Sequence, residues 1–204
     1  MMYEDVLEHY KLLLRCHPLE LSACWTVVRG AAQKMSVNEC VRRLGRDESA
    51  LELLTLADWL EFDRSALFFV ESEAAVMVVE PMGAILSSSS AMGTLSIGGE
   101  VWSVSWNENL AAQLNYARDG GLLAAYDFLY ETRAGGAEPE IFDPYRDFLS
   151  EHVRTPDEGN LQYENSLITW WAAGMAVVEL ASGVRLGSAS LESPLPALVF
   201  EDEF

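Results

Sequence analysis

The sequence predicts an α+β fold in which helices from the N- and C-terminal parts of the chain pack on a central antiparallel sheet. Two observations favour this class. Helical patterns occupy both ends of the chain, and short apolar runs bounded by glycine and proline fill its middle. About five to six strands are expected from those runs. The length of 204 residues, 50% of them hydrophobic, favours a single domain over residues 1–204.

Helices and one strand are expected in the first third of the chain. Apolar side chains at helical spacing predict an amphipathic helix over residues 3–15. Residues 23–29 are rich in β-branched and aromatic side chains and predict a strand. Ser36 and Glu39 form a capping-box pattern that begins a second helix, and a third helix is expected over residues 47–62.

Strands dominate the middle of the chain. Residues 67–71 and 75–80 are apolar runs that predict a hairpin. In residues 100–106, small and polar side chains alternate with large apolar ones, which predicts a half-buried strand. Residues 113–118 and 122–128 flank an Asp-Gly-Gly turn and predict a second hairpin. The last three strands should form a meander.

Loops and helices complete the prediction. The serine run at residues 87–90 indicates a flexible loop. Residues 143–153 begin with an Asp-Pro pair that favours a helix start. Residues 163–182 predict a long buried helix ended by a glycine, and residues 194–204 predict an extended acidic tail.

The charge balance excludes several classes of function. The chain carries 13 Lys and Arg against 32 Asp and Glu, for a net charge of −19. Such a chain repels phosphate backbones, so nucleic-acid binding is not expected. The most apolar run, residues 165–178, is shorter than the roughly 20 residues that a membrane helix needs. The N-terminus has no signal-peptide pattern, and a cytoplasmic protein with no membrane partner is expected.

Motifs for cofactors, metals and catalysis are absent from the sequence. Cys16, Cys24 and Cys40 lack the spacing of zinc ligands, which predicts reduced and mostly buried thiols. No phosphate-binding loop and no GxSxG motif occurs, and no serine has an evident histidine partner. We therefore expect no metal, no cofactor and no catalytic triad.

Polar and aromatic residues at strand ends form one candidate binding site, because ligand pockets combine aromatic walls with a few convergent polar groups. The candidates are Arg29, Glu80, Trp106, Asn107, Asn109 and Arg118. The alternative, which the residue types favour, places Trp106 in the core and uses the two asparagines for turn hydrogen bonds. An Arg29–Glu80 ion pair would join two of these strand ends.

Carboxylates concentrate in the second half of the chain and define a candidate acidic face, whose members are Asp127, Glu131, Asp143, Asp147 and Glu151. The last three recur at every fourth position and would share one face of a helix. Such a face attracts a cationic partner. A solvated surface that keeps the protein soluble is the more common role of such carboxylates.

Several short motifs resemble those of a family of uncharacterised proteins common in actinobacteria. They are Cys24–Gly30, Val41–Gly45, Val79-Glu80-Pro81, Val104–Asn109, Tyr116–Gly120, and a late helix like Ala173–Gly183 followed by Val184-Arg185-Leu186. The family tends to have Asn-Gly where this chain has Met82-Gly83, which weakens any ligand role for that turn. The resemblance implies no activity and no catalytic residues.

The favoured hypothesis is a non-enzymatic acidic protein of the immunity or antitoxin type that caps a basic protein partner. The alternative is a small-molecule-binding protein or an enzyme with a pocket at the strand ends. A third hypothesis is a homo-oligomer. Trp170 and Trp171 would point about 100° apart on one helix, and both are buried only if that helix is covered on more than one side.

Overall fold

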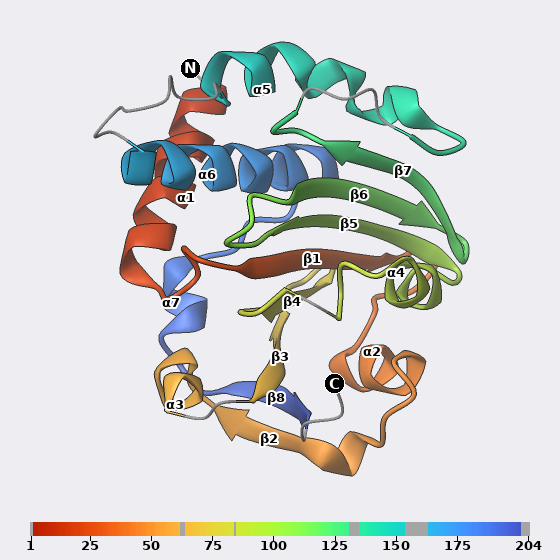
Figure 1. Cartoon of the computed structure of the whole chain (residues 1–204). Helices are drawn as coiled ribbons and strands as arrows, with labels where there is room; N and C mark the ends of the chain where they lie inside the picture. Colours follow the sequence, from red (N-terminus) through yellow and green to blue (C-terminus); the bar gives the residue numbers. More distant parts are fainter. Residues whose placement is uncertain (1, 62–63, 84, 131–134, 154–162, 201–204) are drawn as a thin grey trace.

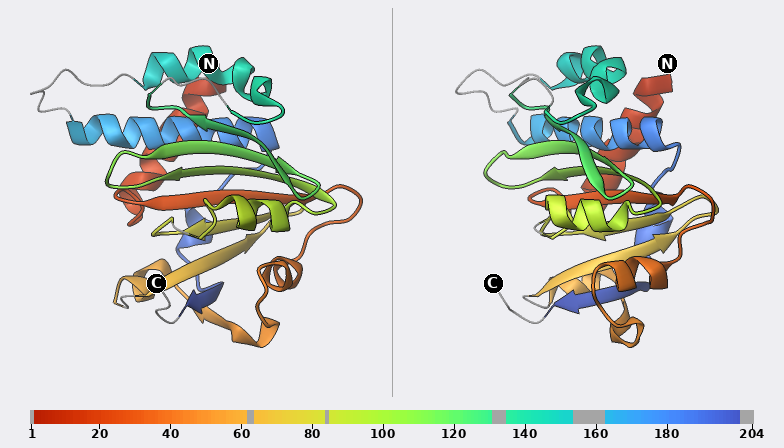
Figure 2. Two further views of the ribbon diagram at one scale, coloured as in Figure 1. Left: turned by 45° about the vertical axis from the view of Figure 1, so that its right-hand side comes forward. Right: turned by 90° about the vertical axis from the view of Figure 1, so that its right-hand side faces the viewer.

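Strands from the whole length of the chain form one antiparallel sheet in the computed structural model, which describes residues 2–61, 64–83, 85–130, 135–153 and 163–200 (Figure 1). The strands are β1 (Ala23–Gly30), β2 (Leu51–Leu54), β3 (Ser65–Glu71), β4 (Val76–Glu80), β5 (Gly99–Trp106), β6 (Ala112–Arg118), β7 (Gly121–Asp127) and β8 (Leu195–Phe200). Their order in the sheet is β2-β8-β3-β4-β1-β5-β6-β7. The strands turn progressively across the sheet (Figure 2), as the right-handed twist of L-peptides requires.

Helices cover both faces of this sheet. They are α1 (Met2–Cys16), α2 (Val37–Arg43), α3 (Leu56–Leu60), α4 (Ser89–Leu95), α5 (Arg146–His152), α6 (Tyr163–Ser182) and α7 (Ser188–Leu191), with the 3-10 helices η1 (Glu48–Ala50) and η2 (Pro139–Tyr145). One core lies between the sheet and α1, α5 and α6. A smaller core lies on the opposite face beneath α2 and α4. The predicted α+β class and the β5-β6-β7 meander are thereby confirmed.

The sheet has eight strands, so the predicted number of five to six is wrong. The additional strands are β2 and β8. β8 lies between β2 and β3 and pairs with both, and residues 195–200 are therefore an inner strand rather than part of a tail. Its side chains reach both cores, as Ala197 packs in one and Leu198 in the other. An apolar run that is buried on both faces lacks the alternation that identifies a strand. Residues 201–204 lie outside the described part.

Residues 47–62 do not form the predicted continuous helix. Asp47 accepts a hydrogen bond from the Ser49 amide and caps the start of η1, which ends at Ala50. After β2, Thr55 and Asp58 cap each other's backbone amides and start the short helix α3. The segment is thus divided into two short helical turns, because Leu51–Leu54 between them pairs with β8 as a strand.

Three smaller differences from the prediction have local causes. Ser88 caps α4 by accepting from the Ala91 amide, so the serine run is partly a helix start. Asp143 lies inside η2, and α5 begins only at Arg146. β5 is buried on both faces over most of its length, since α4 and α6 cover it from opposite sides.

The long helix α6 occupies residues 163–182 as predicted. Gly183 follows with a positive φ of 70° and donates its amide to the Glu179 carbonyl. Trp170 and Trp171 are 2% and 1% exposed. The chain itself covers α6 on several sides, with α1, α5 and the sheet packed around it. These two tryptophans therefore give no indication of a second copy.

Candidate functional site

The strand-end residues predicted as one pocket divide between opposite ends of the sheet. In the pairing of β1 with β5, Ala23 lies opposite Trp106 and Arg29 lies opposite Glu100. Arg118 of β6 pairs with Glu100 as well. Arg29 and Arg118 therefore lie at one end, which we call the glycine end because Gly30 and Gly99 meet there. Glu80, Trp106, Asn107 and Asn109 lie at the other end.

Trp106 and the two asparagines have structural roles. The Trp106 indole donates a 2.9 Å hydrogen bond to the Leu19 carbonyl and stacks on Trp171 at 5.7 Å. The Asn107 side-chain oxygen accepts from the amides of Asn109 and Ala111 at 3.0 and 3.1 Å. These contacts match the alternative of a core tryptophan with turn-forming asparagines.

Glu80 is fully buried and holds the segment that follows β4. Its carboxylate oxygens accept from the amides of Ile85 and Leu86 at 2.7 and 2.8 Å. Glu80 pairs with Cys24 at the start of β1, whereas Arg29 lies near the end of that strand. The expected Arg29–Glu80 ion pair is therefore wrong.

A chain of polar contacts joins the arginines at the glycine end. Arg29 donates to the Ser182 carbonyl at the end of α6 at 2.9 Å and lies 3.3 Å from the Glu100 carboxylate. Tyr116 contacts both Glu100 and Arg118 at 3.5 Å. Burial, and then the charge of Glu100, raises the pKa of Tyr116. A cleft of about 260 Å³ lies beside Arg29, Glu100 and Arg118.

Besides this cleft, a larger hollow lies at the same end of the sheet, beside α2. It measures about 480 Å³, and its lining includes Gly30, Lys34, Glu39, Arg42, Arg43 and Gly98. We call it the basic hollow, because three cationic side chains and one carboxylate line it.

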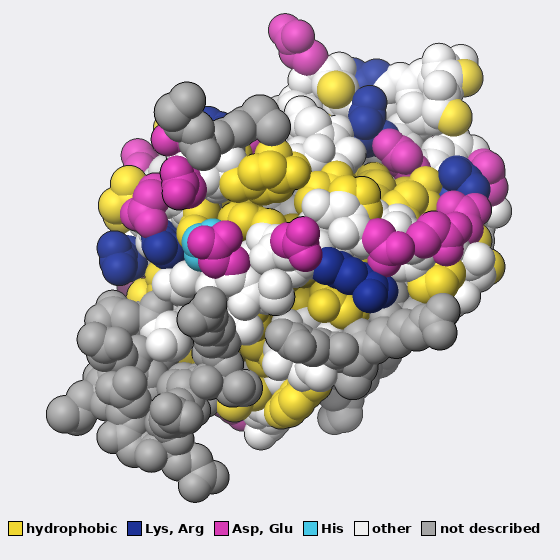
Figure 3. Space-filling model, turned by 90° about the horizontal axis from the view of Figure 1, so that it is seen from above, with side chains coloured by type: hydrophobic (Ala, Val, Ile, Leu, Met, Phe, Trp, Pro, Cys, Tyr) yellow, Lys and Arg dark blue, Asp and Glu magenta, His cyan; other side chains and the backbone are white. Residues whose placement is uncertain are grey.

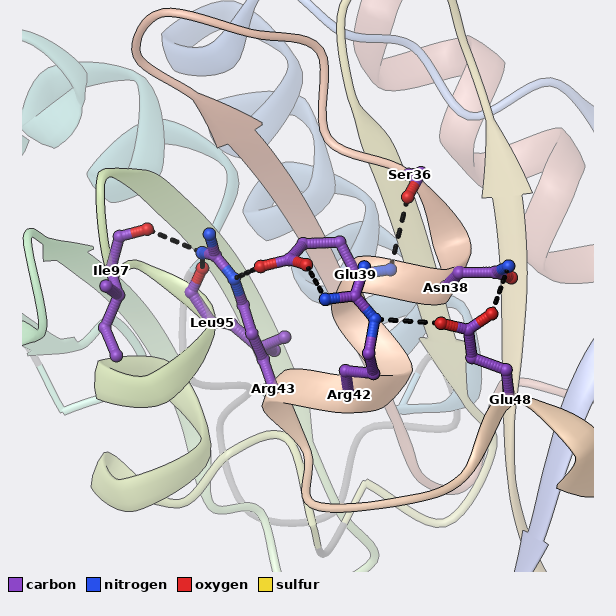
Figure 4. Close-up of polar contacts among 8 residues, drawn as sticks. All are labelled: Ser36, Asn38, Glu39, Arg42, Arg43, Glu48, Leu95 and Ile97. Carbon is purple, nitrogen blue, oxygen red and sulfur yellow. Dashed lines mark hydrogen bonds and ion pairs between the residues drawn. The ribbon is translucent and has the colours of Figure 1, made fainter.

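Glu39 holds both arginines of the basic hollow (Figure 4). Its carboxylate lies 2.7 Å from Arg43 and 2.6 Å from Arg42, and the Arg43 hydrogen bond, with the Arg42 charge, lowers the pKa of Glu39. Arg43 also donates to the carbonyls of Leu95 and Ile97, which ties α2 to the end of α4.

The predicted acidic residues occupy different positions. Asp143, Asp147 and Glu151 are exposed on η2 and α5, although they do not share one helix. Asp127 is used within its own turn, where it accepts from the amides of Leu129 and Tyr130. Glu131 lies outside the described residues. Figure 3 shows acidic side chains in a row across this side of the molecule, with cationic and apolar side chains beside them.

A model of a protein family of unknown function, DUF6461, matches residues 15–194. The chain belongs to this family. No curated protein and no solved structure matches it. The matched region of this DUF6461 chain includes both hollows at the glycine end and the exposed carboxylates of η2 and α5.

Sequence reasoning missed the basic hollow of this DUF6461 protein. Lys34 lies in the loop that follows Gly30. Arg42 and Arg43 lie in the last turn of α2. A signal was available, because the positive charges of the chain gather in its first 50 residues while the carboxylates accumulate later. Only the packing of α2 beside α4 reveals that these cations share a hollow.

One serine of this DUF6461 chain has a histidine partner, contrary to expectation. His17 Nε2 lies 2.9 Å from Ser188 Oγ, and burial lowers the pKa of His17. Ser188 also hydrogen-bonds to Glu192 at 3.4 Å. In the part of the chain that is described, His17 has no hydrogen bond to a carboxylate, so a triad is not formed.

The described residues contain neither a cluster of metal ligands nor a membrane-spanning helix. No group of histidine, cysteine and acidic side chains suited to a metal ion occurs among them. None of the described helices combines the length and the apolar character needed to cross a membrane.

Proposed function

We propose that this protein is a non-enzymatic protein-binding protein, of the immunity or antitoxin type, that holds a basic partner on its acidic face. We define the acidic face as Glu140, Asp143, Asp147 and Glu151, which are exposed along η2 and α5. Asp143 pairs with Arg146 at 2.9 Å, whereas Asp147 and Glu151 have no ion pair within the described residues. This surplus of exposed, unpaired carboxylate is the observation that carries the proposal.

Apolar surface accompanies these charges. Tyr3 of α1 lies 5.2 Å from Phe148 of α5 and is 37% exposed. Protein interfaces combine aromatic contacts with a polar rim, and the rim charges mainly set the rate of association. A basic protein would therefore be attracted by the carboxylates and held by the apolar contacts between them.

The test begins with affinity capture from the source lysate at low and high salt. A basic protein that is retained at low salt and lost at high salt is then purified, and its association rate constant is measured by stopped flow. Asp147→Lys combined with Glu151→Lys should lower that rate constant by ~10-fold or more. An absence of any retained basic protein would overturn the proposal.

A matched control separates a local effect from one of total charge. Glu52 in β2 and Glu61 beside α3 are exposed on the side of the molecule remote from α5 (Figure 1). Glu52→Lys combined with Glu61→Lys makes the same change in net charge, and it should lower the rate constant far less. Equal effects of the two double variants would count against the acidic face as the contact surface.

A further inference from the structure

We propose that the basic hollow binds a small phosphorylated molecule. The first argument is the sign of its charge. The chain has a net charge of −19, yet nearly half of its described Lys and Arg side chains lie around the glycine end. Cations concentrated in a hollow attract an anion to that place, and the excess of carboxylates repels it from the rest of the surface.

The second argument is the number of hydrogen-bond donors that remain available. Lys34 lies 3.9 Å from Glu71, which is beyond hydrogen-bond distance, and 48% of its side chain is exposed. Arg42 uses its Nε and Nη1 atoms on Glu48 and Glu39 and has no hydrogen bond from Nη2 to any described residue. An ammonium group and a guanidinium edge are the donors that phosphate oxygens accept.

The loop that lines the hollow also contains main-chain amides without a hydrogen-bond partner. The amides of Gln33, Lys34 and Met35 make no hydrogen bond within the described part of the chain. Backbone amides without a partner in the protein remain available to an anion. Gly30 allows this loop to fold tightly, because a Cβ atom there would lie 2.1 Å from the Gln33 carbonyl oxygen.

The third argument is preorganisation. The Arg43 side chain is only 18% exposed, because two carbonyls and Glu39 hold it in place. Glu39 in turn fixes Arg42. A ligand that meets groups already held in position loses less free energy to ordering them. The volume of about 480 Å³ is in the range of small-molecule sites.

The experiment measures binding of inorganic phosphate, pyrophosphate and adenosine monophosphate by isothermal titration calorimetry at low salt. We expect saturable binding of at least one of these probes, tighter for pyrophosphate than for inorganic phosphate. Lys34→Gln combined with Arg42→Gln should weaken binding ~10-fold or more, since each lost charged hydrogen bond contributes a similar factor. No saturable binding of any probe at millimolar concentration would overturn the proposal.

A second double variant makes the result specific. Arg15→Gln combined with Arg64→Gln removes the same charge from exposed positions outside the hollow and should leave the dissociation constant unchanged. Equal weakening in both double variants would overturn the proposal. The acidic-face variants should bind the probes normally, so the two proposals fail independently.

Discussion

Glu80 is a buried carboxylate whose contribution to stability can be measured directly. Its oxygens accept from two backbone amides, Ile85 and Leu86, at the smaller core. Glu80→Gln replaces one acceptor by an amide group that cannot accept, so one buried amide loses its partner. The free energy of unfolding should fall by about 1–3 kcal/mol. Urea unfolding checks this. Exposed Glu73→Gln is the control, and an equal loss in both would refute the structural role of Glu80.

Gly174 of α6 is required by the close approach of that helix to the sheet. A Cβ atom at this position would lie 2.7 Å from Val104 Cγ2 and 2.9 Å from Phe128 Cζ. We expect Gly174→Ala to lower the free energy of unfolding by about 1–3 kcal/mol, because a packed core resists added volume. Gly135→Ala is the comparison, since a Cβ atom there meets nothing within 4 Å. Thermal unfolding should show a lower midpoint only for Gly174→Ala.

At the scale of elements, β8 is predicted to be essential to the sheet. Leu198 of β8 is 1% exposed and lies opposite Leu51 of β2. Leu53 of β2 is 71% exposed. Leu198→Ala should lower the free energy of unfolding by about 2–5 kcal/mol, as do other large-to-small changes in cores. The same truncation at Leu53 should change it by less than about 0.5 kcal/mol. A similar result for both leucines would mean that residues 195–200 are not an inner strand.

Elements with a strong local signal could be predicted from the sequence. Residues 163–182 showed a long apolar pattern with a glycine stop, and the Asp-Gly-Gly turn identified the hairpin of β6 and β7. β2 could not be found in this way, because Leu51 to Leu54 contains no β-branched residue and lies between two helix caps. Its strand conformation comes from pairing with β8, which is distant in the sequence.

The candidate sites followed the same division. The Asp-Gly-Gly turn predicts that Arg118 ends a strand, and Gly30 predicts the same for Arg29. The basic hollow depends on Arg43 reaching the carbonyls of Leu95 and Ile97, a contact between helices on different parts of the chain. Residue types alone do not reveal contacts of this kind.

The whole molecule should lose stability in alkaline solution because of two buried thiols. Burial raises the pKa values of Cys24 and Cys40 to about 12 from an ordinary value of about 9. The unfolded chain releases these protons above pH 9, whereas the folded protein retains them. The contribution of the two protonated thiols to the free energy of unfolding is fully present below pH 9. It declines as the pH rises toward 12, by about 1.4 kcal/mol per pH unit for each thiol.

Urea unfolding across this pH range measures the slope. Cys40→Ala removes one of the two thiols whose pKa is raised. The free energy of unfolding should then decline less steeply with pH. Cys16→Ala is the control, because Cys16 is exposed. The same slope in the parent protein and in Cys40→Ala would contradict the expectation, since the other titrating groups are identical in both.

The position of β8 has a consequence for the rate of folding. β2 and β3 lie on either side of a strand that comes late in the chain, and Leu51 must find Leu198 before this part of the sheet closes. Contacts between residues so far apart in sequence form slowly, because loop-closure entropy must first be overcome. Until then the hydrogen-bonding edge of β3, with its buried phenylalanines, is open to strands of other molecules. Dilute refolding should therefore favour the native sheet, and concentrated refolding should favour aggregation through β3.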